Sequence, residues 1–152
     1  MVLEVGNVAP EIDLPTDNGG RFRLSDQKGR AVVIYFYPKD DTSGCTKEAQ
    51  EFTALAAEFA GKGIAVIGIS PDSPKSHGKF REKYGLAIPL AADEEKTVAE
   101  AYGVWVEKSM YGRKYMGIER STFLIDGEGK IAQIWSKVKV PGHAAAVLKA
   151  TS

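Results

Sequence analysis

The residues with the clearest capacity for chemistry surround the only cysteine of the chain, Cys45. The stretch from Tyr35 to Phe52 reads YFYPKDDTSGCTKEAQEF, in which an apolar run ends at Pro38 and a helical pattern begins near Cys45. A free thiol has a pKa near ~8.5, and its thiolate is the nucleophile. Unpaired N–H groups in the first turn of a helix, together with the helix dipole, favour a negative charge. The position of Cys45 therefore predicts a reactive thiol.

The helix dipole alone is too weak to stabilise a thiolate strongly. It contributes roughly 0.3–1 kcal/mol, whereas one pKa unit corresponds to about 1.36 kcal/mol. The hydroxyl of Thr42, three residues upstream, can add a charge-assisted hydrogen bond of roughly 1.5–3 kcal/mol. We expect an arginine from elsewhere in the chain to complete the set of donors.

Most single cysteines are inert core residues, because free cysteine is among the most buried residue types. The neighbours of Cys45 argue against that interpretation. Gly44 precedes it, Thr46 follows it, and polar, turn-forming residues run from Lys39 to Ser43. We therefore predict that Cys45 reacts rather than packs.

Pro38, Thr42 and Cys45 have the spacing Pro-x-x-x-Thr-x-x-Cys, which resembles the active-site signature of peroxiredoxins. The strings FYPKDDTSGCTKEAQEF and GVWVEKSMYGRKYMGIERSTFLID resemble the bacterioferritin comigratory protein (PrxQ) subfamily, and the similarity covers nearly the whole chain. The resemblance implies an α/β, thioredoxin-like fold with a central mixed β-sheet flanked by helices and an N-terminal hairpin. It also implies a single domain over residues 1–152.

The resemblance implies a thiol-dependent peroxidase that reduces hydrogen peroxide and organic hydroperoxides in antioxidant defence, with no metal or cofactor. Cys45 would attack the O–O bond and become a sulfenic acid. Thr42 would orient the peroxide, and Pro38 would shield the thiolate from bulk water. Arg120 matches the active-site arginine of the family.

Arginine suits this chemistry because its planar fork keeps its charge and offers several donors at once. The resemblance also marks Glu48, which would pair with Arg120 and fix its direction, and Gly44 as supporting residues. Without the resemblance, Arg120 would be assigned to a surface ion pair with Glu119 or Glu128, the commoner fate of an arginine.

The chain departs from many relatives in lacking a resolving cysteine. Gln50 stands five residues after Cys45, and the stretch from Pro74 to Tyr84 contains no cysteine. Ser43 also replaces a proline that many relatives carry. A sulfenic acid normally condenses with a second thiol, so here the thiol must come from outside the chain. The resemblance favours thioredoxin over glutaredoxin or glutathione, and a monomer.

Strand and helix patterns alternate along the chain, as in an α/β domain. Residues 31–37 (AVVIYFY) and 64–70 (IAVIGIS) are predicted central parallel strands, because they are apolar throughout. A helix from Cys45 to Gly61 joins them. The further predictions are a leading hairpin at 10–20, helices at 74–84, 98–102 and 143–149, and a hairpin of strands 121–125 and 130–135.

Composition excludes several classes of function. The chain has 152 residues with 20 Lys and Arg against 20 Asp and Glu, so no strong field points to nucleic acid. No apolar run approaches the roughly 20 residues of a membrane helix, and the first ten residues do not resemble a signal peptide. A single cysteine gives no sign of an oxidising compartment, so we expect a cytoplasmic location.

Two alternative functions remain open at this point. A cysteine hydrolase or acyltransferase would need His77 or His143 beside Cys45. A non-catalytic thioredoxin-like interaction or chaperone module would only pack Cys45. The two histidines make a poor zinc ligand set without a second cysteine. We predict that both lie at the surface. The aromatic residues Trp105, Tyr111 and Tyr115 are predicted to pack rather than to rim a substrate opening.

Overall fold

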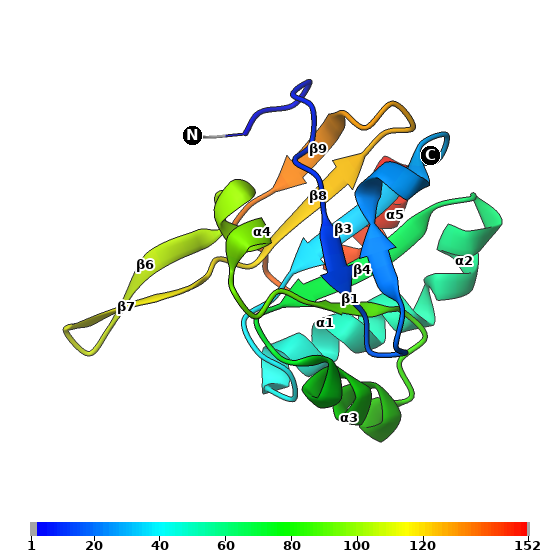
Figure 1. Cartoon of the computed structure of the whole chain (residues 1–152). Helices are drawn as coiled ribbons and strands as arrows, with labels where there is room; N and C mark the ends of the chain where they lie inside the picture. Colours follow the sequence, from blue (N-terminus) through cyan, green and yellow to red (C-terminus); the bar gives the residue numbers. More distant parts are fainter. Residues whose placement is uncertain (1–2, 152) are drawn as a thin grey trace.

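A five-stranded sheet forms the centre of the protein in a computed structural model, which describes residues 3–151 (Figure 1). The order of its strands is β5-β4-β3-β8-β9. The two predicted core strands, β3 and β4, are parallel neighbours, whereas β8 pairs antiparallel with both β3 and β9. The strands are β3 (Val32–Phe36), β4 (Ala65–Ser70), β5 (Leu90–Ala92), β8 (Ser121–Ile125) and β9 (Ile131–Trp135). The prediction of a mixed central sheet is confirmed.

Every residue of β3 is buried, because both faces of the sheet are covered. Val33 and Tyr35 point into a core shared with Phe52, Phe59 and other side chains of four helices. These helices are α1 (Ser43–Ala54), α2 (Ala56–Gly61), α3 (Pro74–Tyr84) and α5 (His143–Ala150).

The alternate residues of β3 face a second core on the other side of the sheet. Ile34 and Phe36 pack there with Ile12 and Phe22 from the N-terminal segment and Tyr102 after α4 (Thr97–Ala101). That segment forms the predicted hairpin of β1 (Asp13–Pro15) and β2 (Arg21–Arg23), followed by the short 3-10 helix η1 (Leu24–Gln27). The hairpin therefore covers the sheet face opposite α1.

The predicted single helix between the core strands is divided in two. α1 ends at Ala54 and α2 begins at Ala56, and the main-chain N–H of Leu55 donates to Phe52 at 3.1 Å, which tightens the turn. The periodicity does not reveal this break, because Phe52 and Phe59 both remain in the same core.

The sequence patterns do not predict one hairpin, formed by β6 (Trp105–Met110) and β7 (Arg113–Ile118). It extends away from the sheet in Figure 1. Tyr111 and Gly112 join the strands with φ of 52° and 78°, the pair of positive values typical of a two-residue hairpin turn. The predicted packing is wrong for Tyr111, which is 98% exposed, and for Tyr115, which is 44% exposed. Trp105 is half-buried against the core.

The close approach of β4 to Tyr35 requires glycine at position 68. A Cβ there would lie 2.7 Å from the ring and hydroxyl of Tyr35, which is fully buried and stacked on Phe52. Because Tyr35 has no space to move into, Gly68→Ala is expected to lower the free energy of unfolding by about 2 kcal/mol. Urea unfolding measures this, with Gly61→Ala as the control, since a Cβ at Gly61 meets nothing within 4 Å. Equal stability of the two variants would contradict the prediction.

None of the helices within residues 3–151 has the length and apolar character needed to cross a membrane. The longest, α1, has 12 residues and carries Lys47, Glu48 and Glu51.

Candidate active site

Cys45 lies near the start of α1, the helix that follows the central strand β3. The loop from Tyr37 to Thr42 connects the two elements, and α1 begins at Ser43, so Cys45 is in its first turn. The side chain of Cys45 is 2% exposed. The carboxyl end of a central parallel strand followed by a helix N-terminus is a common position for chemistry in α/β proteins, because main-chain N–H groups point at the site.

Arg120 reaches Cys45 from the neighbouring strand. It immediately precedes β8, whose first residue, Ser121, pairs with Phe36 at the end of β3. The antiparallel register therefore brings the start of β8 beside the start of α1. Arg120 Nη2 donates to Cys45 Sγ at 3.2 Å, although the two residues are 75 positions apart in the sequence. The structure thus brings together two residues that the sequence marked separately.

Glu48 completes a line of three side chains. It follows Cys45 by three residues, so both lie on one face of α1, and its Oε1 accepts from Arg120 Nη1 at 2.6 Å. Glu48 is 1% exposed, and its Oε2 has no hydrogen-bond partner among the described residues. Burial raises the pKa of Glu48 to about 7, although Arg120 acts in the opposite direction.

Arg120 is held between two acidic groups. Burial acts to lower the pKa of Arg120, but Glu48 and Cys45 outweigh it and the pKa lies above the usual value. Gly44 allows the close approach, because a Cβ at this position would lie 3.3 Å from Arg120 Nη2. The guanidinium is therefore a permanent cation aimed at the sulfur.

The other two motif residues lie in the loop before α1. Thr42 takes the N-cap position of α1, and its hydroxyl donates to the main-chain oxygen of Lys39 at 2.9 Å rather than to Cys45. The expected hydrogen bond from Thr42 to the sulfur is therefore replaced by a local one. Pro38 is half-buried and Thr42 is exposed.

The surface position predicted for the two histidines is wrong. His77 is completely buried and His143 is 7% exposed. His143 Nε2 lies 2.7 Å from Thr122 Oγ1, and burial, with a smaller effect of Arg120, lowers its pKa to about 4. Buried histidines bound inside a polar network carry no signal in a single sequence, so this misassignment reflects tertiary structure.

Neither histidine is bonded to the thiol. His77 contacts Asp40 and the main-chain oxygen of Ala91, and His143 contacts Thr122. Within residues 3–151, the side-chain hydrogen bond to Cys45 Sγ comes from Arg120. A Cys-His pair, which the hydrolase alternative requires, is therefore not assembled here.

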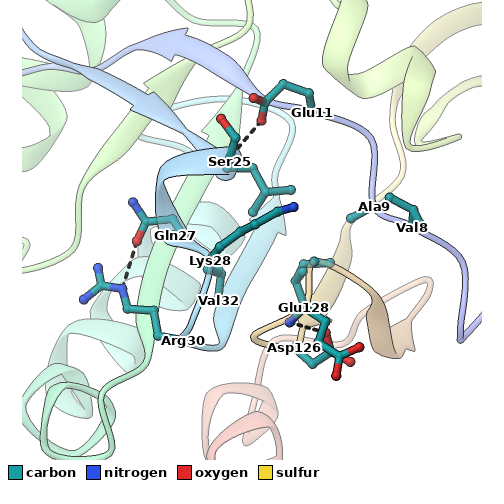
Figure 2. Close-up of a pocket in the computed structure, with 13 residues that line it drawn as sticks. Val8, Ala9, Glu11, Ser25, Gln27, Lys28, Arg30, Val32, Asp126 and Glu128 are labelled. Atoms are coloured by element: carbon teal, nitrogen blue, oxygen red, sulfur yellow. Dashed lines mark hydrogen bonds between the residues drawn. The ribbon is translucent and has the colours of Figure 1, made fainter.

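The chain also forms a small pocket of about 170 Å³ away from these residues (Figure 2). Its apolar wall includes Val8, Leu24 and Val32, with charged groups such as Glu11 and Lys28 at the rim. Val32 is the first residue of β3, whereas Cys45 follows the last, so the pocket lies at the opposite end of the strand. It does not belong to the thiol site.

Comparison with known proteins gives a consistent result over the full chain. Residues 5–134 match the model of the AhpC/TSA family. The putative peroxiredoxin bcp of Coxiella burnetii is 53% identical over 148 residues, covering 97% of this chain and 98% of the relative. Peroxiredoxin Bcp of Bacillus subtilis is 50% identical over 149 residues, covering 98% and 95% of the two chains.

Similar solved structures point to the same family as the sequence matches. The bacterioferritin comigratory protein of Xanthomonas campestris, solved in work on its alkyl peroxide reduction activity, superposes with a TM-score of 0.91 at 46% identity. The match covers 99% of this chain and 96% of that one. The thioredoxin-like fold expected from the sequence is confirmed.

The fold, the buried thiol and the matches place the chain in one class: it belongs to the AhpC/TSA family. Within that family it is a peroxiredoxin of the bacterioferritin comigratory protein (PrxQ) group, with a single cysteine. It is accordingly a thiol-dependent peroxidase, whose substrate is a hydroperoxide and whose reductant is a thiol.

Proposed function

We propose that Cys45 is the peroxidatic nucleophile and that Arg120 activates it directly. The observation that supports this most strongly is the 3.2 Å hydrogen bond from Arg120 Nη2 to the buried Cys45 Sγ. A fixed cation at a buried sulfur favours the thiolate and is stronger there than in water. Glu48 orients the guanidinium through its 2.6 Å contact, and Gly44 leaves space for it.

In the first step, the thiolate sulfur bonds to one peroxide oxygen while the O–O bond breaks. The leaving oxygen takes the bonding electron pair and a proton, and departs as water or an alcohol. Cys45 becomes a sulfenic acid. Arg120 and the N–H groups at the start of α1 stabilise the charge that develops on the leaving oxygen. Thr42 orients the peroxide, and Pro38 limits the access of water.

The second step uses a thiol from another molecule, because the chain has one cysteine. That thiol attacks the sulfenic sulfur and releases water, which gives a mixed disulfide, and a second thiol then frees Cys45. Thioredoxin is the reductant favoured over glutaredoxin or glutathione. The protein acts as a cytoplasmic monomer. The reductant and the monomeric state are supported by resemblance to the PrxQ subfamily, and the cytoplasmic location by the single cysteine, which gives no sign of an oxidising compartment.

The substrates are hydrogen peroxide and organic hydroperoxides. The alkyl peroxide reduction activity of the X. campestris relative supports the organic class. Among the described residues, the thiol site does not form a metal-binding set, because the cation Arg120 lies between Cys45 and Glu48, the two groups that could bind a metal.

Stopped-flow oxidation of the reduced protein by near-stoichiometric hydrogen peroxide tests the proposal. We expect a fast reaction that persists below neutral pH, yields a trappable sulfenic acid and disappears in Cys45→Ser. A reaction as slow as that of a free thiol would overturn the assignment and favour an interaction module in which Cys45 only packs.

Excess peroxide is expected to inactivate the enzyme. A sulfenic acid with no partner thiol in the chain persists and can be oxidised further to sulfinic acid, which ordinary thiols do not reduce. Turnover with limiting reductant should therefore decline as peroxide is raised, and mass spectrometry should find two added oxygens on Cys45. Constant turnover at high peroxide would contradict this prediction.

A further inference from the structure

A buried polar network joins the loop before α1 to the helix α3. Asp40, which is 8% exposed, lies in this loop two residues after Pro38 and two before Thr42. Its carboxylate accepts from Tyr37 Oη at 2.6 Å and from Ser76 Oγ at 2.7 Å. The third partner is His77.

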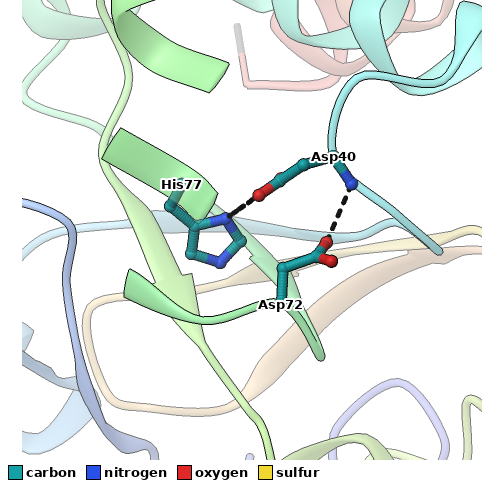
Figure 3. A group of neighbouring side chains, drawn as sticks. All are labelled: Asp40, Asp72 and His77. Atoms are coloured by element: carbon teal, nitrogen blue, oxygen red, sulfur yellow. Dashed lines mark hydrogen bonds and ion pairs between the residues drawn. The ribbon is translucent and has the colours of Figure 1, made fainter. Parts of the chain in front are cut away.

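His77 projects from α3 toward Asp40, as Figure 3 shows. Its Nδ1 lies 2.8 Å from Asp40 Oδ2 and 3.0 Å from Asp40 Oδ1. On the opposite side of the ring, Nε2 lies 3.0 Å from the main-chain oxygen of Ala91 in β5. The imidazole therefore bridges the loop and the edge of the sheet.

The partners of His77 determine where its protons lie. A carbonyl oxygen only accepts, so Nε2 must carry a proton to bond Ala91. The Asp40 oxygens already receive hydroxyl protons from Tyr37 and Ser76, and one further proton is shared with Nδ1. A fully satisfied buried pair of this kind fixes its members in one geometry.

The loop main chain is held as well. The N–H of Asp40 donates to Asp72 Oδ2 at 2.8 Å (Figure 3). Asp72 also accepts from Ser70 Oγ at 2.7 Å. The oxygens of Asp40 and Asp72 and the nitrogen of His77 are close enough to bind a metal ion together. Their existing partners account for the cluster as a hydrogen-bond network, however, so we assign it a positioning role.

The next residue has its own tether to α3. Asp41 has a φ of 57°, an unfavourable value for a non-glycine residue, and its carboxylate is held by Lys83 and Tyr84. The ion pair between Asp41 and Lys83 is exposed and contributes little to stability, whereas the Asp40–His77 contact is buried. The buried contacts of Asp40, which include both oxygens facing His77 Nδ1, therefore hold the loop more firmly than the Asp41 tether does.

We propose that His77 is a positioning residue for the peroxidase reaction, acting through Asp40 on the loop that carries Pro38 and Thr42. The inference rests on the proposed function of Cys45. His77 does not touch the thiol site; it sets the position of the residues that orient the peroxide and cover the sulfur. Loss of its bond to Asp40 displaces that loop, and misplacement of catalytic groups by ~1 Å can slow a reaction by about 10²-fold.

Two substitutions at the same position test this. In His77→Asn, the side-chain amide can present an N–H where Nδ1 lies, toward Asp40. In His77→Gln, the amide reaches the position of Nε2, toward Ala91, and the bond to Asp40 is lost. We expect His77→Gln to slow the reaction of Cys45 with hydrogen peroxide by about 10–10²-fold. His77→Asn should stay within a few-fold of the unmodified protein.

Stopped-flow peroxide oxidation and urea unfolding are measured together for each variant. A merely structural role would lower the stability of both variants while leaving the peroxide rate of the folded protein unchanged. Equal peroxide rates for His77→Gln and the unmodified protein, or equal slowing by Asn and Gln, would overturn the inference. If His77→Gln does not fold, Ser76→Ala removes one hydroxyl donor to Asp40 and should still slow oxidation several-fold; an unchanged rate would overturn the inference.

The matched control is His143→Gln, which removes the other buried histidine. Its pKa of about 4 means that the imidazole is neutral at neutral pH, so no charge is lost. We expect its peroxide rate to match that of the unmodified protein. A slow reaction of the unmodified protein would instead disprove the role of Cys45, which separates failure of the proposed function from failure of this inference.

Discussion

Replacing Arg120 by methionine is expected to slow the oxidation of Cys45 by hydrogen peroxide by about 10²–10³-fold, the usual cost of losing one preorganised donor at a developing charge. Methionine keeps much of the apolar stem but supplies neither the cation nor the N–H that lies 3.2 Å from the sulfur. Stopped-flow kinetics at neutral pH gives the rate constant directly.

Arg120→Lys is the informative companion to this variant. Lysine keeps a positive charge but lacks the fork that reaches Cys45 and Glu48 at once. The peroxide rate of Arg120→Lys should therefore fall between those of the unmodified protein and Arg120→Met. Glu48 would lose its counter-charge in Arg120→Met and would take up a proton, which avoids an unpaired buried anion. Oxidation of Arg120→Met within a few-fold of the unmodified protein would show that Arg120 has no direct role.

Glu48→Gln is expected to remove a large pH dependence of stability. The pKa of Glu48 is about 7 in the folded protein because of burial, against an ordinary value of 4.5 for a glutamate. Between these pH values the folded state holds a proton that the unfolded state has lost, so the free energy of unfolding falls as pH rises. The gap corresponds to about 3 kcal/mol, lost progressively between pH of about 4.5 and 7.

Urea unfolding over this pH range measures the effect. The unmodified protein should lose stability across the range, and Glu48→Gln should show a much smaller slope, because its amide does not ionise. Glu58→Gln, on an exposed position of α2, is the control and should keep the slope. Parallel pH profiles for Glu48→Gln and the unmodified protein would disprove this assignment. The amide oxygen of glutamine can still accept from Arg120, so peroxide oxidation should persist.

Much of the central fold could be predicted from local patterns. The apolar runs that became β3 and β4 are buried on both faces, and Pro74 and Gly85 bound α3 as expected. The β6–β7 hairpin could not be predicted in this way, because it protrudes from the body and is buried mainly at its base, where Trp105 pairs with Ile118, so burial imposes no alternation along its strands. Its strands are stabilised by pairing with each other, which leaves no periodic signature.

Only part of the thiol site could be predicted from the sequence. The environment of Cys45 indicated reactivity, but only the family motif singled out Arg120, since its approach depends on the pairing of β8 with β3. The roles of the remaining motif residues stay predictions. The network around His77 could not be predicted from local patterns, because its partners Asp40 and Ala91 lie 37 and 14 positions away in the sequence.

The pairing of β3 with β8 also has a consequence for biosynthesis. Ribosomes add roughly 5–20 residues per second, so several seconds separate the emergence of Cys45 from that of Arg120, 75 positions later. During that interval the nascent chain lacks the strand that closes the sheet beside β3, and its cysteine has no cation beside it. On the proposed role of Arg120, Cys45 is expected to react slowly with peroxide during translation and to gain its full reactivity only once β8 has paired with β3.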